Sequence, residues 1–102
     1  PVVHSEFDHG RSLFTQKGCI ACHDGQTPIG PSLRQIYGKN VPLSDGSSVI
    51  ADENYLRRSL LEPNFQIVKG YQPVMPTFQG QLTEEDILAL IHYIKSQEKG
   101  DL

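Results

Sequence analysis

The 102-residue sequence has no tryptophan, two cysteines and one methionine, and it lacks a long apolar run. Its longest such run, "ILALI" at 87–91, falls far short of the roughly 20 residues that a membrane-spanning helix needs. The formal net charge is −3 and the isoelectric point is about 5.7, with lysines and arginines scattered along the chain. This balance argues against a nucleic-acid surface and against a basic membrane-binding helix.

The length is that of one small domain, and we expect residues 1–102 to form one. Hydrophobic residues make up 37% of the chain, with nine glycines and seven prolines. A core of this size usually needs a disulfide, a metal or a cofactor to stabilise it. The chain begins "PVVHSEF" without Met or a recognisable signal peptide, so we expect a processed protein or a domain excised from a longer, membrane-anchored chain.

Apolar residues at three-to-four spacing predict helices at 6–17, 52–61 and 84–98, with apolar stripes that are typical of core packing. The expected end signals are Ser5 with Asp8, Asp52, Thr83 with Asp86, and a stop at Gly100. Elsewhere we expect loops at 24–32 and 63–82, a short helical turn at 33–37, and a small hairpin turning at Asp45-Gly46 within 38–50. The long irregular segment 63–82 suggests a functional loop, because such loops are unusual in small domains.

The string "GCIACH" at 18–23 allows four interpretations. A structural zinc site needs four ligands, usually from two knuckles, and no second knuckle exists. A thioredoxin-like dithiol follows a strand, whereas a predicted helix precedes Cys19. A purely structural disulfide is a third possibility. The fourth interpretation, which we favour, is covalent attachment of haem, for which C-x-x-C-H is the signature.

Haem chemistry accounts for the spacing of these three residues. Two thiols one helical turn apart, Cys19 and Cys22, can add to the two vinyl groups at one edge of the same porphyrin. His23 then places its imidazole under the iron as the proximal ligand. The cofactor would also supply the apolar surface that the small core lacks.

A second iron ligand is expected at Met75, because axial His–Met ligation is a known solution that raises the reduction potential. Pro73 and Pro76 flank it and restrict the backbone, which suits a ligand better than a flexible gap-filler. The rival ligands are histidines that we expect on the surface or on helix faces: His4, His9 and His92. Pro31 of "GPSL" has a carbonyl to accept a hydrogen bond from the ring of His23, which would fix the ring's orientation.

With these features together, the sequence closely resembles small monohaem cytochromes c from about Gly10 to Ile94. The resemblance implies an all-α cytochrome c fold of about three to five helices around one covalent haem c. It also implies crossing terminal helices that meet through Gly10 and Phe14 on one side and Leu90 and Tyr93 on the other.

A finer resemblance is carried by "DG" before "ADENYL", then "EP", "IVKGY", "MP" and "LTEEDI". These strings are similar to the cytochrome c domain fused to subunit II of bacterial haem–copper oxidases and to monohaem subunits of alternative complex III. Two departures concern the haem propionates: Ala51 falls near the place of a missing tryptophan, and Lys39 stands where an arginine often occurs. The residues expected to line the haem pocket are Leu33, Tyr37, Lys39, Leu60 and Tyr71.

These features predict an electron carrier rather than an enzyme, because filled axial positions leave no site for oxygen or peroxide. We expect transfer of single electrons in a respiratory chain, from a donor complex or small carrier to a copper centre or a terminal oxidase. The alternatives are a free-standing periplasmic carrier and a haem enzyme or gas-binding protein with an open distal site. The family attaches haem outside the cytoplasm, so we expect a periplasmic domain or one on the outer membrane face, soluble as a segment and membrane-associated in full. Because the chain is acidic, its docking face should carry little charge, or its partner should be covalently attached.

Overall fold

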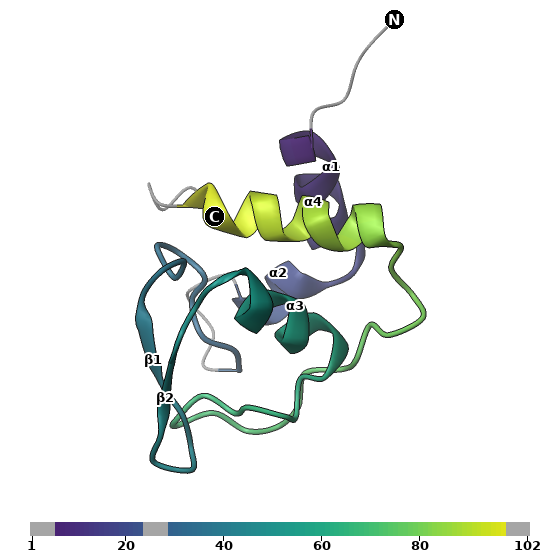
Figure 1. Cartoon of the computed structure of the whole chain (residues 1–102). Helices are drawn as coiled ribbons and strands as arrows, with labels where there is room; N and C mark the ends of the chain where they lie inside the picture. Colours follow the sequence, from purple (N-terminus) through teal and green to yellow (C-terminus); the bar gives the residue numbers. More distant parts are fainter. Residues whose placement is uncertain (1–5, 24–28, 98–102) are drawn as a thin grey trace, which may run out of the picture.

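Two helices from opposite ends of the sequence cross, and the main hydrophobic core is built around them. They are α1 (Glu6–Gln16) and α4 (Glu84–Lys95), and Figure 1 shows them in purple and yellow-green. The computed structural model describes residues 6–23 and 29–97. Within these residues, no helix has both the length and the apolar character that crossing a membrane requires.

The crossing is close because α1 has a glycine at the contact point. A Cβ built on Gly10 would lie 2.1 Å from the carbonyl oxygen of Ala89, so no larger residue fits without moving a backbone. The ring of Tyr93 lies beside this point, with its centroid 5.3 Å from those of both Phe7 and Phe14. The contact predicted through Gly10, Phe14 and Tyr93 is therefore present.

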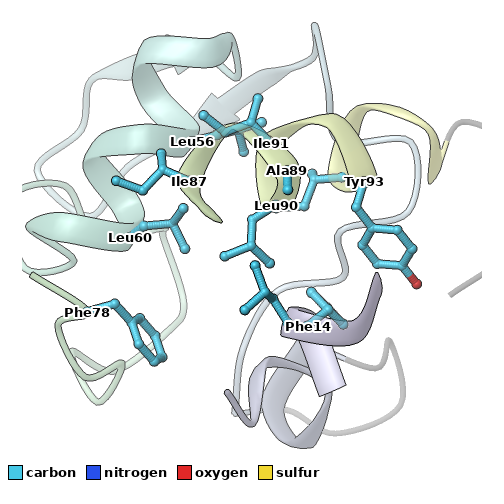
Figure 2. Close-up of a cluster of buried hydrophobic side chains, with 11 residues drawn as sticks. Phe14, Leu56, Leu60, Phe78, Ile87, Ala89, Leu90, Ile91 and Tyr93 are labelled. Carbon is cyan, nitrogen blue, oxygen red and sulfur yellow. The ribbon is translucent and has the colours of Figure 1, made fainter. Parts of the chain in front are cut away.

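The central core surrounds this crossing and extends towards α3 (Glu53–Leu61), as Figure 2 shows. Phe14 and Leu90 are 2% and 1% exposed and fill the space between the crossed helices. Leu60 of α3 and Phe78 of the long loop close the same cluster. A separate small cluster, formed by Val41, Leu43 and Ala51, lies beneath the β-hairpin.

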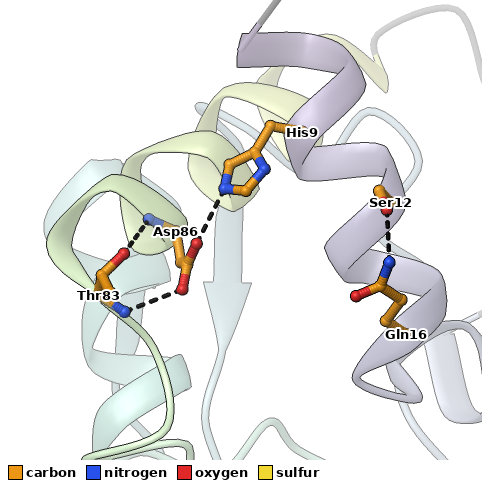
Figure 3. Close-up of polar contacts among 5 residues, drawn as sticks. All are labelled: His9, Ser12, Gln16, Thr83 and Asp86. Carbon is orange, nitrogen blue, oxygen red and sulfur yellow. Dashed lines mark hydrogen bonds and ion pairs between the residues drawn. The ribbon is translucent and has the colours of Figure 1, made fainter. Parts of the chain in front are cut away.

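Local caps begin two of the helices as predicted. Asp52 accepts a hydrogen bond from the Tyr55 N–H at the start of α3. Thr83 and Asp86 form a reciprocal capping box at the start of α4, and His9 of α1 lies 2.8 Å from the same Asp86 carboxylate (Figure 3). On the exposed face of α1, the Gln16 side-chain amide donates a hydrogen bond to the Ser12 hydroxyl.

The last helix ends at Lys95, before the predicted end at 98. The side chains of Ser96 and Gln97 both donate to the carbonyl of Tyr93, which also accepts the Ser96 N–H in a tighter last turn. The predicted stop at Gly100 and the predicted cap at Ser5 lie outside the described residues.

The predicted helical turn at 33–37 is wrong, because two successive tight turns occupy this segment. Gln35 adopts a left-handed conformation with φ 58°, which a right-handed helix cannot include. Its N–H donates to the carbonyl of Gln97, 2.9 Å away, just beyond the end of α4. A distant backbone partner therefore determines the conformation here.

The predicted hairpin is present as two short antiparallel strands, β1 (Asn40–Pro42) and β2 (Ser48–Ile50). The long segment 63–82 has no helix, as predicted, and an isolated bridge between Leu43 and Val68 holds it against the hairpin. Farther along, Thr77 and Phe78 hydrogen-bond to carbonyls at the end of α3. The loop therefore runs along the hairpin and α3, and these hydrogen bonds hold it in place (Figure 1).

Candidate haem site

The CIACH segment forms a short helix of its own, α2 (Cys19–His23), which the sequence predictions did not include as an element. Gly18, with φ 78°, separates it from α1, and its carbonyl accepts the Ala21 N–H at the first turn. One helical turn places Cys19 and Cys22 on the same side, half-buried and not joined by a disulfide. Burial raises the pKa of the Cys19 thiol, with a smaller contribution from Cys22.

The imidazole of His23 is held by the carbonyl predicted for it. Nδ1 of His23 lies 2.8 Å from the carbonyl oxygen of Pro31. A carbonyl can only accept, so Nδ1 carries the proton and Nε2 keeps its lone pair. Burial lowers the pKa of His23, although the bond to Pro31 partly opposes this, and the neutral form is favoured.

Gly30 provides the space in which this imidazole sits. A Cβ at position 30 would lie 3.0 Å from Cε1 and 3.1 Å from Nδ1 of His23, and 3.0 Å from the carbonyl oxygen of Cys22. These distances are tighter than ordinary contacts, so any side chain here would push against the ring. Gly30 thus leaves room for the ring of His23, and the carbonyl of Pro31 fixes its orientation through a hydrogen bond.

α2 opens onto a cleft of about 320 Å³ that is lined mainly by apolar side chains. Its walls come from the ends of α1 and α2, the segment 29–36, β1, one face of α3, the long loop and α4. Met75 lines the cleft from the loop and is half-buried. The sequence-predicted residues that line it are Cys19, Cys22, His23, Pro31, Leu33, Lys39, Leu60, Tyr71 and Met75.

Tyr37, which was predicted to line the pocket, is not part of the cleft. Its ring lies 4.9 Å from the Lys95 ammonium, which also pairs with Glu53 at 2.9 Å. Ala51 does not line the cleft either, because it is fully buried in the small cluster beneath the hairpin. In both cases the side chain packs against other residues and not into the cleft.

The two rival histidines that the structure describes lie on the α1–α4 crossing, outside the cleft. His9 pairs with Asp86 of α4, and His92 of α4 lies 3.4 Å from Glu6 of α1. Each is about half exposed, at 46% and 50% of the side chain. His4 lies outside the described residues.

Several cleft residues were missed by the sequence predictions. Tyr55 and Ser59 line it from α3, and Val41 and Val68 line it from the hairpin and the long loop. Tyr55 belongs to the apolar stripe of its helix, which indicated ordinary core. Tyr55 lies five residues before the predicted pocket residue Leu60, a spacing that does not place the two on one helix face, so no sequence signal pointed to Tyr55 as a cleft residue.

The charge of the cleft differs from that of the whole chain. Among the described residues, Lys17 and Lys39 line it, and no aspartate or glutamate does. The sequence as a whole carries a formal charge of −3. The cleft is therefore suited to a mainly apolar group that carries acidic substituents.

Comparison with known proteins addresses the family. Residues 7–98 match the family model described as cytochrome c. Cytochrome c6 of Petalonia fascia is 30% identical over 105 residues, which cover 93% of this chain and 98% of the relative. Cytochrome c6 of Bumilleriopsis filiformis is 27% identical, covering 93% and 95%, and cytochrome c2 iso-2 of Magnetospirillum molischianum is 30% identical, covering 76% and 89%.

The chain belongs to the cytochrome c family. It is an electron-transfer protein with one covalently bound haem c, as the sequence predicted. The described residues suit that cofactor. This cytochrome c has a largely apolar cleft with two thiols on one helical turn and a neutral imidazole beside it, and these are the groups that thioether attachment and iron ligation require.

Proposed function

We propose that this cytochrome c is a one-electron carrier in which His23 and Met75 are the two axial ligands of the haem iron. The observation that carries the proposal is that one apolar cleft brings together the C-x-x-C-H helix and the methionine of a loop 52 positions away (75 − 23). Cys19 and Cys22 would form the thioether bonds. When bound, haem c supplies an iron centre that cycles between the ferric and ferrous states.

The residues around the site have distinct tasks. Pro31 holds the ring of His23 so that Nε2 is left to bind iron. Met75 offers a thioether sulfur from a proline-flanked loop that is itself fixed to the end of α3. Two protein ligands would leave no open position for a small molecule, so this arrangement favours transfer of electrons over chemistry at the iron.

Replacing Met75 with Ala tests the distal ligand. We expect the Met75→Ala holoprotein to keep its covalent haem, to have a lower reduction potential and to bind carbon monoxide rapidly in the ferrous state. Gln79→Ala is the matched control, since Gln79 lies on the same loop, is exposed and does not line the cleft. If the potential and spectrum of Met75→Ala equal those of the wild type, Met75 is not the ligand.

Carbon monoxide also separates the carrier from the alternative of a haem enzyme or gas-binding protein. The ferrous wild-type protein should show no rapid spectral change on addition of the gas, because Met75 would occupy the sixth position. A rapid change in the native fold would instead indicate an open distal site. Intact mass checks the first step, since protein made with the maturation machinery must carry the added mass of one haem.

The acceptor is a further part of the proposal. The strings shared with oxidase subunit II domains and with subunits of alternative complex III support delivery of electrons to a copper centre or terminal oxidase in a respiratory chain. We place this reaction in the periplasm or on the outer membrane face, because the family attaches haem outside the cytoplasm. The relatives named cytochrome c6 and cytochrome c2 equally support a free-standing carrier.

Stopped-flow oxidation distinguishes these acceptors. The reduced protein is mixed with a purified haem–copper oxidase, and the rate is compared with that of a free-standing bacterial cytochrome c. Fast, saturable oxidation by the oxidase supports the respiratory assignment. Oxidation no faster than that by a non-physiological protein acceptor would contradict it.

A further inference from the structure

The loop that carries Met75 is attached to the end of α3 immediately after the methionine. The Thr77 hydroxyl donates a hydrogen bond to the carbonyl of Leu61, 2.7 Å away, and the Phe78 N–H donates to the carbonyl of Leu60 at 3.0 Å. Both carbonyls belong to the last turn of α3, where a helix has no N–H of its own to offer them. The loop therefore completes the end of the helix, and the helix end fixes the loop.

The hydroxyl of Thr77 has a single orientation because both of its hydrogen-bonding roles are filled. While it donates to Leu61, it accepts the N–H of Gln79 at 3.1 Å. An N–H can only donate, so the hydroxyl hydrogen must point to the Leu61 carbonyl. Threonine is also stiff about its first side-chain torsion, because its β-carbon is branched. The side chain of Thr77 therefore holds the loop and the helix end at a defined distance.

Met75 itself depends on this attachment. In the described part of the chain no hydrogen bond involves Met75, and the prolines on either side of it, Pro73 and Pro76, have no N–H to donate. The half-buried Met75 side chain packs against the central core. Pro76 links Met75 to Thr77 through a backbone torsion that the proline ring fixes, so a movement of Thr77 also moves the methionine.

Thr77 can be changed without altering either the core or the cleft wall. It is exposed, and it is not among the residues that line the cleft. Phe78, which makes the second attachment, is 8% exposed, belongs to the central core and also lines the cleft. An effect of Thr77 on the site must therefore act through the position of Met75.

We propose that Thr77 is the positioning residue for the distal ligand: its hydrogen bond to Leu61 keeps Met75 in the cleft and limits how often the methionine leaves the iron. A methionine that stays in place keeps the sixth position closed. This bond therefore favours an electron carrier over a protein that binds small molecules at the iron. The inference rests on the proposed function, because it requires Met75 to be the second iron ligand.

The slow rate at which the ferrous holoprotein binds carbon monoxide measures how often Met75 leaves. The gas can bind only where the methionine has dissociated, so at a fixed gas concentration the rate follows the open fraction. Thr77→Val removes the hydroxyl and keeps the branched shape. The rate should rise about 2- to 10-fold, which is the equilibrium effect of losing one ordinary hydrogen bond. Thr77→Ser keeps the hydroxyl and should bind the gas at close to the wild-type rate.

Thr15→Val is the matched control. The Thr15 hydroxyl also donates to a backbone carbonyl, that of Arg11, but from an exposed position on α1 outside the cleft, so this variant should bind carbon monoxide at the wild-type rate. Hydrogen exchange of the holoprotein, followed by NMR, gives a second measurement. The Phe78 amide keeps its acceptor in Thr77→Val, yet it should exchange faster there, because the loop should separate from α3 more often.

The outcomes separate this inference from the proposed function. If the wild type binds carbon monoxide rapidly, or if Met75→Ala shows that Met75 is not the ligand, both are overturned. If Met75 is the ligand but Thr77→Val binds the gas no faster than the wild type, or Thr77→Ser binds it as fast as Thr77→Val, this inference alone is overturned. A role in folding only would lower the free energy of unfolding in urea and leave the gas-binding rate unchanged. Thr77→Ala lacks the same hydroxyl and provides the same check if Thr77→Val does not accumulate as holoprotein.

Discussion

Replacing Gly10 with Ala should destabilise the protein, because position 10 is where α1 meets α4 most closely. The added Cβ would lie 2.1 Å from the carbonyl oxygen and 2.7 Å from the carbonyl carbon of Ala89, and 2.8 Å from the Cβ of Tyr93. The first two are backbone atoms of a helix, which cannot turn aside as a side chain could. The helices must therefore separate, and the packing of Phe14 and Leu90 between them is lost.

Two opposing effects determine the magnitude. Overpacking a tight core costs about 1–3 kcal/mol, and contact with backbone puts this site near the upper end, at about 3 kcal/mol. Alanine favours a helix over glycine by about 1 kcal/mol. The free energy of unfolding should therefore fall by about 2 kcal/mol, which corresponds to about 8–16 °C in melting temperature for a domain of this size.

Denaturant unfolding of the holoprotein, followed by far-UV circular dichroism and by haem absorption, measures this change. Arg11→Ala is the control, because it is an exposed neighbour on α1 and should stay within about 0.5 kcal/mol of the wild type. A Gly10→Ala variant whose unfolding free energy matches that of the control would refute the close-approach reasoning. A more stable variant would show that helix propensity outweighs the contact.

Two further substitutions test local geometry. Gly30→Ala places a Cβ 3.0 Å from Cε1 of His23, so it should tilt the ring and raise the high-spin fraction of the ferric absorption spectrum without loss of covalent haem; an unchanged spectrum would contradict this. The hydrogen bond from the Thr83 N–H lowers the pKa of Asp86, and the hydrogen bond from the His9 side chain lowers it less strongly. Stability from this carboxylate is therefore present above its unfolded pKa of about 3.9 and is lost as pH falls through the lower folded value. In urea titrations, the free energy of unfolding of Asp86→Asn should be lower than that of the wild type at pH 7, and this difference should narrow below pH 4. A difference equally large at both pH values would contradict the linkage. Glu85→Gln is the control in the same turn.

Sequence patterns predicted the parts of the fold that depend on near neighbours. The spacing of apolar residues placed α1, α3 and α4, and the caps at Asp52 and Thr83 were correct because a cap involves residues three or four apart. The segment 33–37 was predicted wrongly because its conformation depends on a bond from Gln35 to Gln97, 62 positions away (97 − 35). Local propensity contains no information about such a partner.

The same division applies to the candidate site. Cys19, Cys22 and His23 were predicted from the sequence because thioether attachment requires a fixed local spacing, and the single methionine made Met75 the one candidate thioether ligand. The sequence did not identify Tyr55 as a cleft residue or exclude Tyr37.

By itself, then, the sequence determined the family and the cofactor and predicted the residues that would attach it, because each of these depends on residue type and short spacing. The tertiary structure decided which side chains share the cleft: it placed Met75 and the C-x-x-C-H helix on one cleft, and it bonded Lys39 to Ala51, just before α3. It also decided how closely α1 and α4 approach at Gly10. These are contacts between distant segments, and the packing of the whole chain determines them because no local preference specifies which segments meet.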